Sequence, residues 1–289
     1  MVETRFPPPR PSAGVLIAGC GDVGSELGRR LAAAGHAVWG LRRRARDLPS
    51  CIRPLAADLA DPATLAALPA CDYVVYAAAA ERHDEAAYRR SYVDGVSHLI
   101  AALRGQDAVP RRVFFTSSTA VYGQDRGEWV DETSPAEPAS FSGRVLLEGE
   151  ETLRTSGIPA TVVRLAGIYG PGRTRLIDEV RSGRAGRAAA SYTNRIHRDD
   201  CAGFLAHLVA MDLAGEAVEE VYLGVDDEPA ERGEVIRWLA ARLGVAAPAA
   251  EAAPPAGRNK RCRNARLKAT GYRLRFPTFR EGYAAILDG

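Results

Sequence analysis

Hydroxyl side chains follow one another at the end of a short apolar segment. Residues 113–115, Val-Phe-Phe, are typical of a buried strand, and four hydroxyl residues, Thr116 to Thr119, come directly after them. Tyr122 and a glycine close the stretch FTSSTAVYG. A buried hydroxyl that lacks a hydrogen-bond partner costs about 1–3 kcal/mol. The run therefore predicts that these hydroxyls face a polar ligand at the end of the strand.

A second candidate site is the glycine-rich stretch GCGDVG at residues 19–24. It lies between an apolar segment, 15–18, and a helical pattern, 23–34, which is the context of a dinucleotide-binding loop. The first glycine permits a tight turn, the second lets a pyrophosphate approach the backbone, and the third lets the helix pack on the strand. The N–H groups of the first helical turn would bind the phosphates. The residues predicted to bind the cofactor here are Gly19, Gly21, Asp22, Val23 and Gly24.

Arginines end the second apolar segment, AVWGL at 37–41, where an NAD-binding protein usually has an acidic residue for the ribose 2′-hydroxyl. Arg42 and Arg43 suit a 2′-phosphate instead, because a guanidinium group binds phosphate in a bidentate way. A solvated arginine run in an arginine-rich protein is the alternative. We predict NADP(H) as the cofactor.

The elements that position these residues alternate along the chain. Strand-like segments at 15–18, 37–41, 73–78, 113–117 and 160–165 are separated by helical patterns near 23–34, 61–68, 86–104 and 142–156. This alternation predicts an α/β fold, a Rossmann doubly wound parallel sheet covered by helices. We expect a loose lead-in at 1–13, a dinucleotide-binding core at 14–170, and a smaller C-terminal α/β substrate lobe at 171–289 that is interleaved with the core. The Ala/Pro-rich stretch 245–257 is expected to be a linker or exposed loop.

Composition excludes several classes of function. A net charge of +2 gives no basic field for nucleic acid, and no apolar run is long enough to span a membrane. The five cysteines are odd in number and widely spaced, and the histidines show no metal-binding spacing, so we expect a cytoplasmic protein without a metal site. The expected partner is a small-molecule substrate.

The motifs together resemble the extended and atypical short-chain dehydrogenase/reductases, the epimerase/dehydratase-like group, over residues 15–285. A bacterial subgroup, the YeeZ type, is the most similar. The resemblance rests on the glycine loop, AADL (56–59), DYVVYAAAA (72–80), FTSSTAVYG (115–123), GRVLLEGEE (143–151), RLAGIYGPG (164–172) and IHRDD (196–200).

The resemblance implies roles for single residues. Ser118 matches the catalytic Ser/Thr that hydrogen-bonds the substrate oxygen, and Thr119, Gly167, Tyr169 and His197 are expected at the substrate, although His197 is equally well explained as a loop histidine. Related proteins commonly pair through helices that correspond to 86–104 and 142–156, so a homodimer is expected. The remaining residues implied at the cofactor are Asp58, Leu59, Ala77, Ala78, Ala79, Thr116, Ser117, Leu165 and Ala166.

One part of the family pattern is missing. Family members place Tyr-x-x-x-Lys on one face of the helix at 142–156, where the lysine lowers the pKa of the phenol. Here Ser142 and Leu146 occupy these positions, or Phe141 and Val145 if the match slips by one residue, and neither register restores the pair. No lysine precedes Lys260. Three hypotheses remain. The protein is an NADPH-dependent oxidoreductase or epimerase on a small carbonyl or sugar-nucleotide-like substrate, with Tyr122 or Tyr169 as the acid; or it is a non-catalytic NADP(H) sensor; or it performs non-redox chemistry with a structural cofactor.

Overall fold

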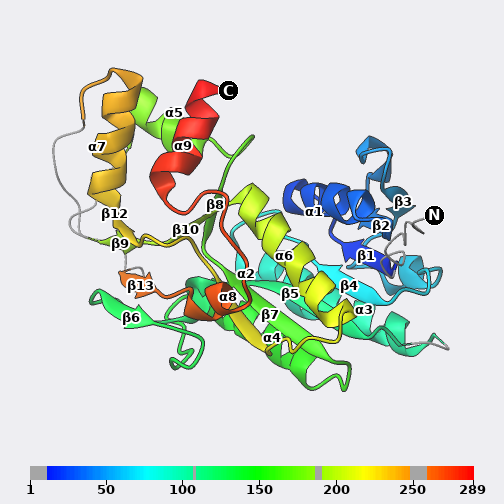
Figure 1. Cartoon of the computed structure of the whole chain (residues 1–289). Helices are drawn as coiled ribbons and strands as arrows, with labels where there is room; N and C mark the ends of the chain where they lie inside the picture. Colours follow the sequence, from blue (N-terminus) through cyan, green and yellow to red (C-terminus); the bar gives the residue numbers. More distant parts are fainter. Residues whose placement is uncertain (1–11, 107–108, 186–190, 248–258) are drawn as a thin grey trace, which may run out of the picture.

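A computed structural model describes residues 12–106, 109–185, 191–247 and 259–289. Its centre is a parallel sheet with seven strands in the order β11-β7-β5-β4-β1-β2-β3 (Figure 1). The predicted α/β fold with a doubly wound parallel sheet is therefore confirmed. The strands are β1 (Gly14–Ala18), β2 (Ala37–Arg42), β3 (Arg53–Ala56), β4 (Tyr73–Tyr76), β5 (Arg112–Ser118), β7 (Ala160–Leu165) and β11 (Val221–Gly224).

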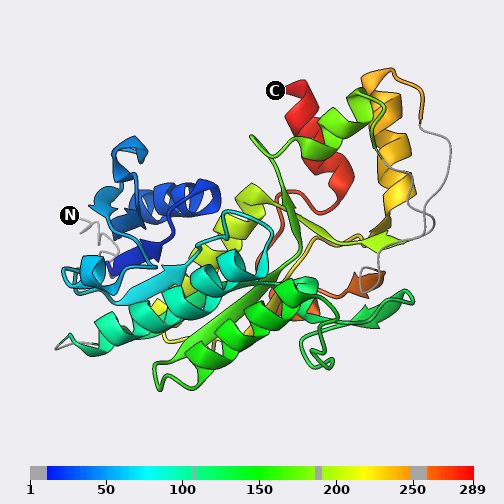
Figure 2. The same ribbon diagram turned by 180° about the vertical axis from the view of Figure 1, so that it is seen from behind.

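Helices cover both faces of the sheet because the side chains of each strand alternate between the faces. Val15 and Ile17 of β1 pack with α1 (Asp22–Ala33) and α6 (Arg198–Leu213). Leu16 and Ala18 of the same strand pack with α3 (Gly95–Arg104) and α4 (Phe141–Arg154). Figure 1 shows the first pair of helices in front of the sheet, and Figure 2 shows the second pair from behind.

The segment predicted as one helix, 86–104, consists of three pieces. A π-helix at Arg90–Asp94 separates α2 (Glu85–Arg89) from α3. The Tyr76 hydroxyl donates a hydrogen bond to the carbonyl oxygen of Ser91 inside this segment. Gly149 of α4 lies so close that an added Cβ would be 2.1 Å from the Tyr92 carbonyl oxygen. These two contacts hold the wide turn against the sheet and α4. Such π-helical turns are frequent at functional sites.

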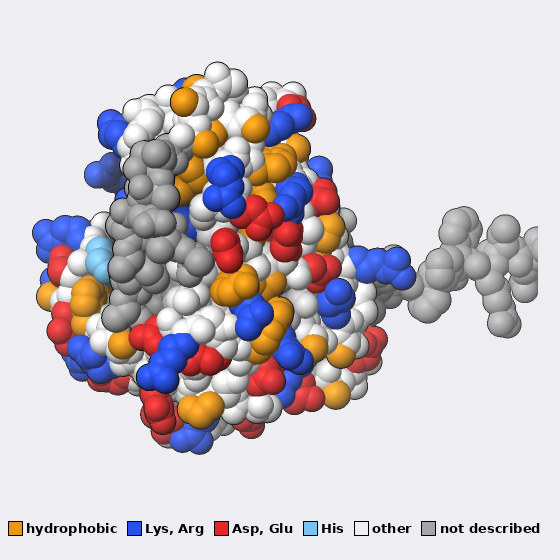
Figure 3. Space-filling model, turned by 90° about the vertical axis from the view of Figure 1, so that its left-hand side faces the viewer, with side chains coloured by type: hydrophobic (Ala, Val, Ile, Leu, Met, Phe, Trp, Pro, Cys, Tyr) orange, Lys and Arg blue, Asp and Glu red, His pale blue; other side chains and the backbone are white. Residues whose placement is uncertain are grey.

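The second half of the chain contributes to the sheet and also forms a separate helical cluster. α6 and β11 belong to the sheet layers, whereas α5 (Arg175–Arg181), α7 (Arg232–Leu243) and α9 (Phe279–Asp288) pack on one another above the sheet. On the face seen in Figure 3, basic and acidic side chains are interspersed. The expected linker at 245–257 and the expected lead-in at 1–13 lie almost entirely outside the described residues.

Short strand pairs connect distant segments. They are β8 (Gly167–Tyr169) with β10 (Arg195–His197), β9 (Tyr192–Thr193) with β12 (Ala230–Glu231), and β6 (Glu128–Val130) with β13 (Lys260–Cys262). The helical pattern at 61–68 forms only a 3-10 turn, Pro62–Leu65; two further 3-10 turns, Ala45–Asp47 and Thr119–Val121, and the helix α8 (Ala265–Ala269) complete the described elements.

Candidate functional site

The glycine loop joins β1 to α1 and leaves room for a ligand. Gly19 has φ +84°, and an added Cβ would lie 2.3 Å from the Cα of Ala78, so only glycine fits. A Cβ on Gly21 would have only one neighbour, the Gly19 carbonyl oxygen at 3.9 Å. Gly24 packs α1 on β1, since its Cβ would lie 3.0 Å from Ile17 Cγ2. No side chain caps the start of α1, so its first N–H groups are available to an anion.

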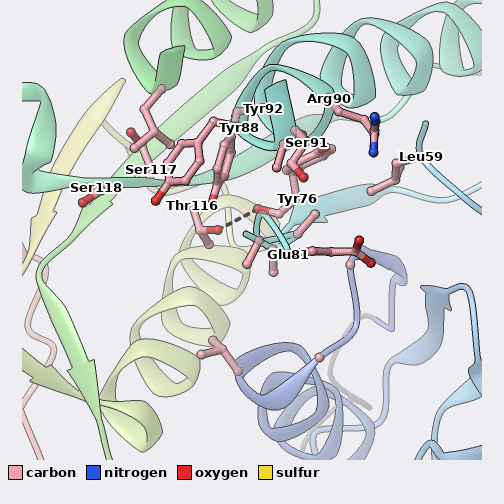
Figure 4. Close-up of a pocket in the computed structure, with 18 of the residues that line it drawn as sticks. Leu59, Tyr76, Glu81, Tyr88, Arg90, Ser91, Tyr92, Thr116, Ser117 and Ser118 are labelled. Carbon is pink, nitrogen blue, oxygen red and sulfur yellow. Dashed lines mark hydrogen bonds between the residues drawn. The ribbon is translucent and has the colours of Figure 1, made fainter. Parts of the chain in front are cut away.

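A cavity of about 610 Å³ runs along the carboxyl ends of the sheet strands from β3 to β7 (Figure 4). Open α/β sheets bind their ligands at this edge. Gly24 is the one residue predicted at the cofactor that does not line this cavity. The sequence-predicted residues that do line it are Gly19, Gly21, Asp22, Val23, Arg42, Arg43, Asp58, Leu59, Ala77, Ala78, Ala79, Thr116, Ser117, Ser118, Leu165 and Ala166.

Arginines lie at the β2 end of the cavity. Arg42 is half-buried, whereas the Arg43 side chain is 59% exposed and forms an ion pair with Glu81, which also lines the cavity. Asp58 follows β3, and its carboxylate accepts a hydrogen bond from the Ala60 N–H at 3.0 Å. The position that directly follows β2 therefore carries positive charge, and the nearby aspartate stabilises a turn.

The hydroxyls at the end of β5 each have a protein partner. Thr116 Oγ1 donates to the carbonyl oxygen of Tyr76 at 3.0 Å, and Ser117 Oγ donates to Glu150 Oε1 at 2.5 Å. Ser118 Oγ accepts from the Ala120 N–H at 3.1 Å and caps the following 3-10 turn. A hydroxyl that accepts one bond can still donate its own proton. Ser118 therefore keeps a donor for a molecule in the cavity.

A buried charge network lies behind the hydroxyl run, and the sequence reasoning missed it. Arg164 of β7 pairs with Glu150 of α4, with 2.7 Å between Arg164 Nη2 and Glu150 Oε2, and both side chains are buried. Arg164 Nη1 also donates to the Tyr122 hydroxyl at 2.8 Å. The sequence did contain a signal for this network: Arg164 is a charged residue within the apolar strand ATVVRL, and a buried charge requires a partner.

Tyr122 does not lie where the prediction of a catalytic acid placed it. Its side chain is 1% exposed, it is absent from the cavity lining, and its hydroxyl accepts from Arg164. Burial raises the pKa of this phenol to about 12, despite the opposing effect of Arg164. Lys260 is far from Tyr122 in the sequence but close to it in the structure, where its Nζ donates to the Tyr122 carbonyl oxygen at 2.8 Å. Pairing of β6 with β13 brings it there.

The four residues expected at the substrate lie outside the cavity lining. Burial raises the pKa of Tyr169, whose hydroxyl donates to the Thr278 carbonyl oxygen at 3.4 Å. His197 Nδ1 accepts from the Asp199 N–H and caps α6, and its ring lies 4.0 Å from that of Phe276. Burial lowers the pKa of His197 to about 4. Thr119 belongs to a 3-10 turn and Gly167 is exposed, whereas its neighbour Ile168 lines the cavity.

The positions of the missing tyrosine and lysine do face the cavity. Ser142 and Leu146 of α4 line it, and both are buried. The Ser142 hydroxyl lies 3.0 Å from that of Ser140, the residue that caps α4. Arg144 is exposed and donates to the Ala139 carbonyl oxygen, so it does not replace the lysine.

Three tyrosines that the sequence reasoning did not single out line the cavity: Tyr76, Tyr88 and Tyr92. Figure 4 shows the rings of Tyr88 and Tyr92 projecting toward the hydroxyl residues at the end of β5. The two residues are four positions apart on the segment formed by α2 and the π-helix, and this spacing places them on one face. The spacing was visible in the sequence, but the direction of that face was not.

Residues from the second half of the chain also reach the glycine loop. Asp22 Oδ2 lies 2.6 Å from Arg173 Nε, and Asp22 Oδ1 lies 3.0 Å from Arg198 Nη1. Arg173 lines the cavity. Two guanidinium groups thus stand beside the start of α1, where the predicted pyrophosphate would lie.

Two kinds of feature are absent from the described ranges. Within residues 12–106, 109–185, 191–247 and 259–289, no group of three or more His, Cys, Asp or Glu side chains is arranged to hold a metal ion. None of the helices in these ranges is both long and apolar enough to cross a membrane.

The parallel sheet, the glycine loop and the cavity at the carboxyl edge define a dinucleotide-binding protein of the Rossmann type. The profile of the NAD dependent epimerase/dehydratase family matches residues 15–210, and the chain belongs to this family.

Individual relatives extend this result. The chain is 31% identical to Protein YeeZ of Escherichia coli K12 over 211 residues, which are 70% of this chain and 74% of YeeZ. A structure from Methylobacillus flagellatus, assigned to the NAD-dependent epimerases/dehydratases, is 42% identical with a TM-score of 0.84, and the match covers 96% of this chain and 98% of that one. Human epimerase family protein SDR39U1 (isoform 2), solved with NADPH, shares the fold at 23% identity with a TM-score of 0.76 and covers 96% and 99% of the two chains.

Proposed function

We propose that this protein binds NADP(H) and acts as an oxidoreductase or epimerase-like enzyme on a small carbonyl or sugar-nucleotide-like substrate. Members of the family bind NAD or NADP. The observation that carries the proposal is one continuous cavity with the glycine loop, Arg42 and Arg43, and the hydroxyl end of β5 along its wall.

The residues present suit a dinucleotide. The open space at Gly21 and the uncapped start of α1 accommodate a pyrophosphate, since a side chain at Gly21 would project into free volume. Arg42 and Arg43 supply guanidinium groups for a 2′-phosphate. Binding would require Arg43 to exchange Glu81 for that phosphate, and both side chains are exposed enough to move.

The nicotinamide end of the cavity is formed by Thr116, Leu165 and Ala166. Bound NADP(H) would supply or accept a hydride there. Ser118 would donate its hydroxyl proton in a hydrogen bond to the substrate oxygen, which orients the reacting carbon and stabilises negative charge on the oxygen. Arg82, Arg90 and Arg173 add positive charge to the same lining and favour an anionic substrate such as a phosphorylated one.

The absence of the Tyr-x-x-x-Lys pair favours a second candidate, an NADP(H)-sensing protein without turnover. Ser142 and Leu146 occupy the cavity wall where that pair would project. A sensor needs affinity and a change of state but no proton donor. The third hypothesis, non-redox chemistry with a structural cofactor, involves no hydride transfer and therefore needs no proton donor to accompany one.

Cofactor consumption separates these candidates. An oxidoreductase oxidises many equivalents of NADPH per chain when small ketones and aldehydes are supplied, which absorbance at 340 nm follows. A sensor binds one equivalent and leaves the rest unchanged, and so does an epimerase-like enzyme, which returns the hydride to its substrate. Tight binding without consumption of NADPH would therefore reject the oxidoreductase and leave the epimerase-like enzyme, the non-redox enzyme and the sensor.

A further inference from the structure

The cavity lacks the usual proton donor of α4 but contains other phenols close by. Ser142 and Leu146 leave the α4 wall without a titratable group at the two positions that face the cavity. The adjoining part of the cavity lining is formed by α2 and the π-helix, from which Tyr88 and Tyr92 project. The Tyr88 ring lies 5.5 Å from the ring of Phe141, the first residue of α4. Tyr88 therefore lies directly beside the helix that would otherwise carry the acid.

The three tyrosines of the lining differ in their partners. The Tyr76 hydroxyl donates to the Ser91 carbonyl oxygen and is fully buried. Burial raises the pKa of Tyr92 to about 12. Tyr88 is half-buried, and its hydroxyl lies 3.2 Å from Nδ1 of His83. Among the tyrosines that line the cavity, Tyr88 is the one whose hydroxyl bonds to an imidazole, a group that can replace a proton after transfer.

Aromatic contacts fix this pair in place. The His83 ring lies 5.4 Å from the Tyr88 ring in an edge-on arrangement and 5.0 Å from the Phe141 ring. Tyr88 also lies 5.3 Å from Tyr92. His83 itself is exposed, so solvent can return a proton to it. The pair thus joins the cavity to bulk water.

We propose that Tyr88, positioned by His83, is the proton donor of this site and substitutes for the missing Tyr-x-x-x-Lys pair. Bound NADPH would supply a hydride to the carbonyl carbon, and the C=O π pair would move onto oxygen. That oxygen takes the proton of the Tyr88 hydroxyl to give the alcohol. The protonated His83 imidazole returns a proton to the phenolate, and solvent reprotonates His83. A nearby imidazolium stabilises the phenolate, as the lysine does in the usual arrangement.

This inference rests on the proposed NADP(H)-dependent reduction, and the test separates the two. Calorimetry with NADPH, and turnover of NADPH with butane-2,3-dione, are measured on the wild type, Tyr88→Phe and Tyr92→Phe. Phenylalanine keeps the ring contacts, so we expect all three to bind NADPH equally. Loss of a general acid lowers kcat about 10²–10⁴-fold in Tyr88→Phe. Tyr92→Phe removes the neighbouring phenol of the same cavity lining, and we expect it to lose less kcat than Tyr88→Phe.

Two further measurements address His83. In His83→Ala, added imidazole restores part of the lost kcat, because the exposed site admits it. In the unliganded protein labelled at tyrosine Cζ, the NMR resonance that disappears in Tyr88→Phe shifts in His83→Ala. This last measurement needs neither cofactor nor substrate.

Each contrary result has a distinct meaning. Wild-type kcat in Tyr88→Phe, or an unmoved Cζ resonance in His83→Ala, would overturn the inference. NADPH binding without reduction, by the wild type, of butane-2,3-dione or of phosphorylated ketones such as dihydroxyacetone phosphate would also contradict it, because no proton transfer would remain for Tyr88 to perform. Failure to bind NADPH would reject the proposed function itself.

Discussion

Single residues around β5 divide between the cavity and the core. Thr116, Ser117 and Ser118 all line the cavity, but the Ser117 hydroxyl points back to Glu150, in the network that also contains Arg164 and Tyr122. Strand alternation explains this difference, because successive side chains point to opposite faces. The hydroxyls therefore line the cavity and, through Ser117, also stabilise a buried charge network; that they face a ligand stays a prediction.

The buried pair of Glu150 and Arg164 should be essential for stability. Glu150→Gln removes one charge and leaves a buried guanidinium, which typically costs about 3–5 kcal/mol. Glu148→Gln is the matched control on the same helix, because its pair with Arg89 is exposed to solvent and an exposed pair adds little to stability. Urea unfolding of both variants measures the difference. Equal small losses would show that the network is not a stabilising feature.

His197 should make stability depend on pH. Burial lowers its pKa in the folded chain to about 4, below the ordinary value of about 6.5. The unfolded chain then binds more protons between these values, so stability is full above pH 6.5 and falls as pH decreases toward 4, by up to about 3 kcal/mol.

The test of this linkage uses His197→Asn, which keeps a side chain able to cap α6. Chemical unfolding at several pH values between 7 and 4 should show a flatter dependence in this variant than in the wild type. The same slope in both proteins would show that other groups cause the acid sensitivity.

At the scale of elements, glycines decide how closely the helices approach. Gly149 brings α4 against the Tyr92 carbonyl and so fixes the π-helix that carries Tyr92. Gly19 and Gly24 fit the loop to β4 and β1, whereas Gly21 keeps space open. Glycine thus permits close packing at Gly149, Gly19 and Gly24 and leaves space open at Gly21.

Gly21→Ala should separate binding from folding. The Cβ of the new alanine meets no atom closer than 3.9 Å, so the free energy of unfolding should stay within about 0.5 kcal/mol of the wild-type value. The added methyl group would occupy space needed by the pyrophosphate, and NADPH affinity should fall at least about tenfold, or about 1.4 kcal/mol. Unchanged affinity in calorimetry would place the pyrophosphate elsewhere.

Considering the whole molecule, local patterns predicted the sheet core and the cofactor side of the cavity. The glycine loop, the arginines after β2 and the residues after β4 lie at strand ends, so a parallel sheet necessarily gathers them. Tyr122, His197 and Lys260 could not be placed this way. Their surroundings depend on contacts between distant segments: β5 with β7, β8 with β10, and β6 with β13.

The homodimer stays a prediction, and the structure shows which side chains of α4 could contact a second copy. Val145, Leu146 and Leu153, apolar residues of α4, are buried within the chain and so are not available to a partner copy. Leu147 is half-buried and lines a second hollow of about 1080 Å³ between α4 and the β7–β11 edge. If α3 and α4 pair across two copies, Leu147→Arg should yield a monomer in sedimentation. A monomeric wild type at high concentration would contradict the prediction.

The central claim is that the cavity binds NADP(H) through Arg42 and Arg43, and calorimetric titration tests it directly. We expect the wild type to bind NADPH at least about tenfold more tightly than NADH, a difference of about 1.4 kcal/mol. Arg42→Ala should remove most of this preference while leaving NADH affinity unchanged, and Arg46→Ala, outside the cavity lining, serves as the control. Equal affinities of the wild type for the two cofactors, or full NADPH affinity in Arg42→Ala, would contradict the account.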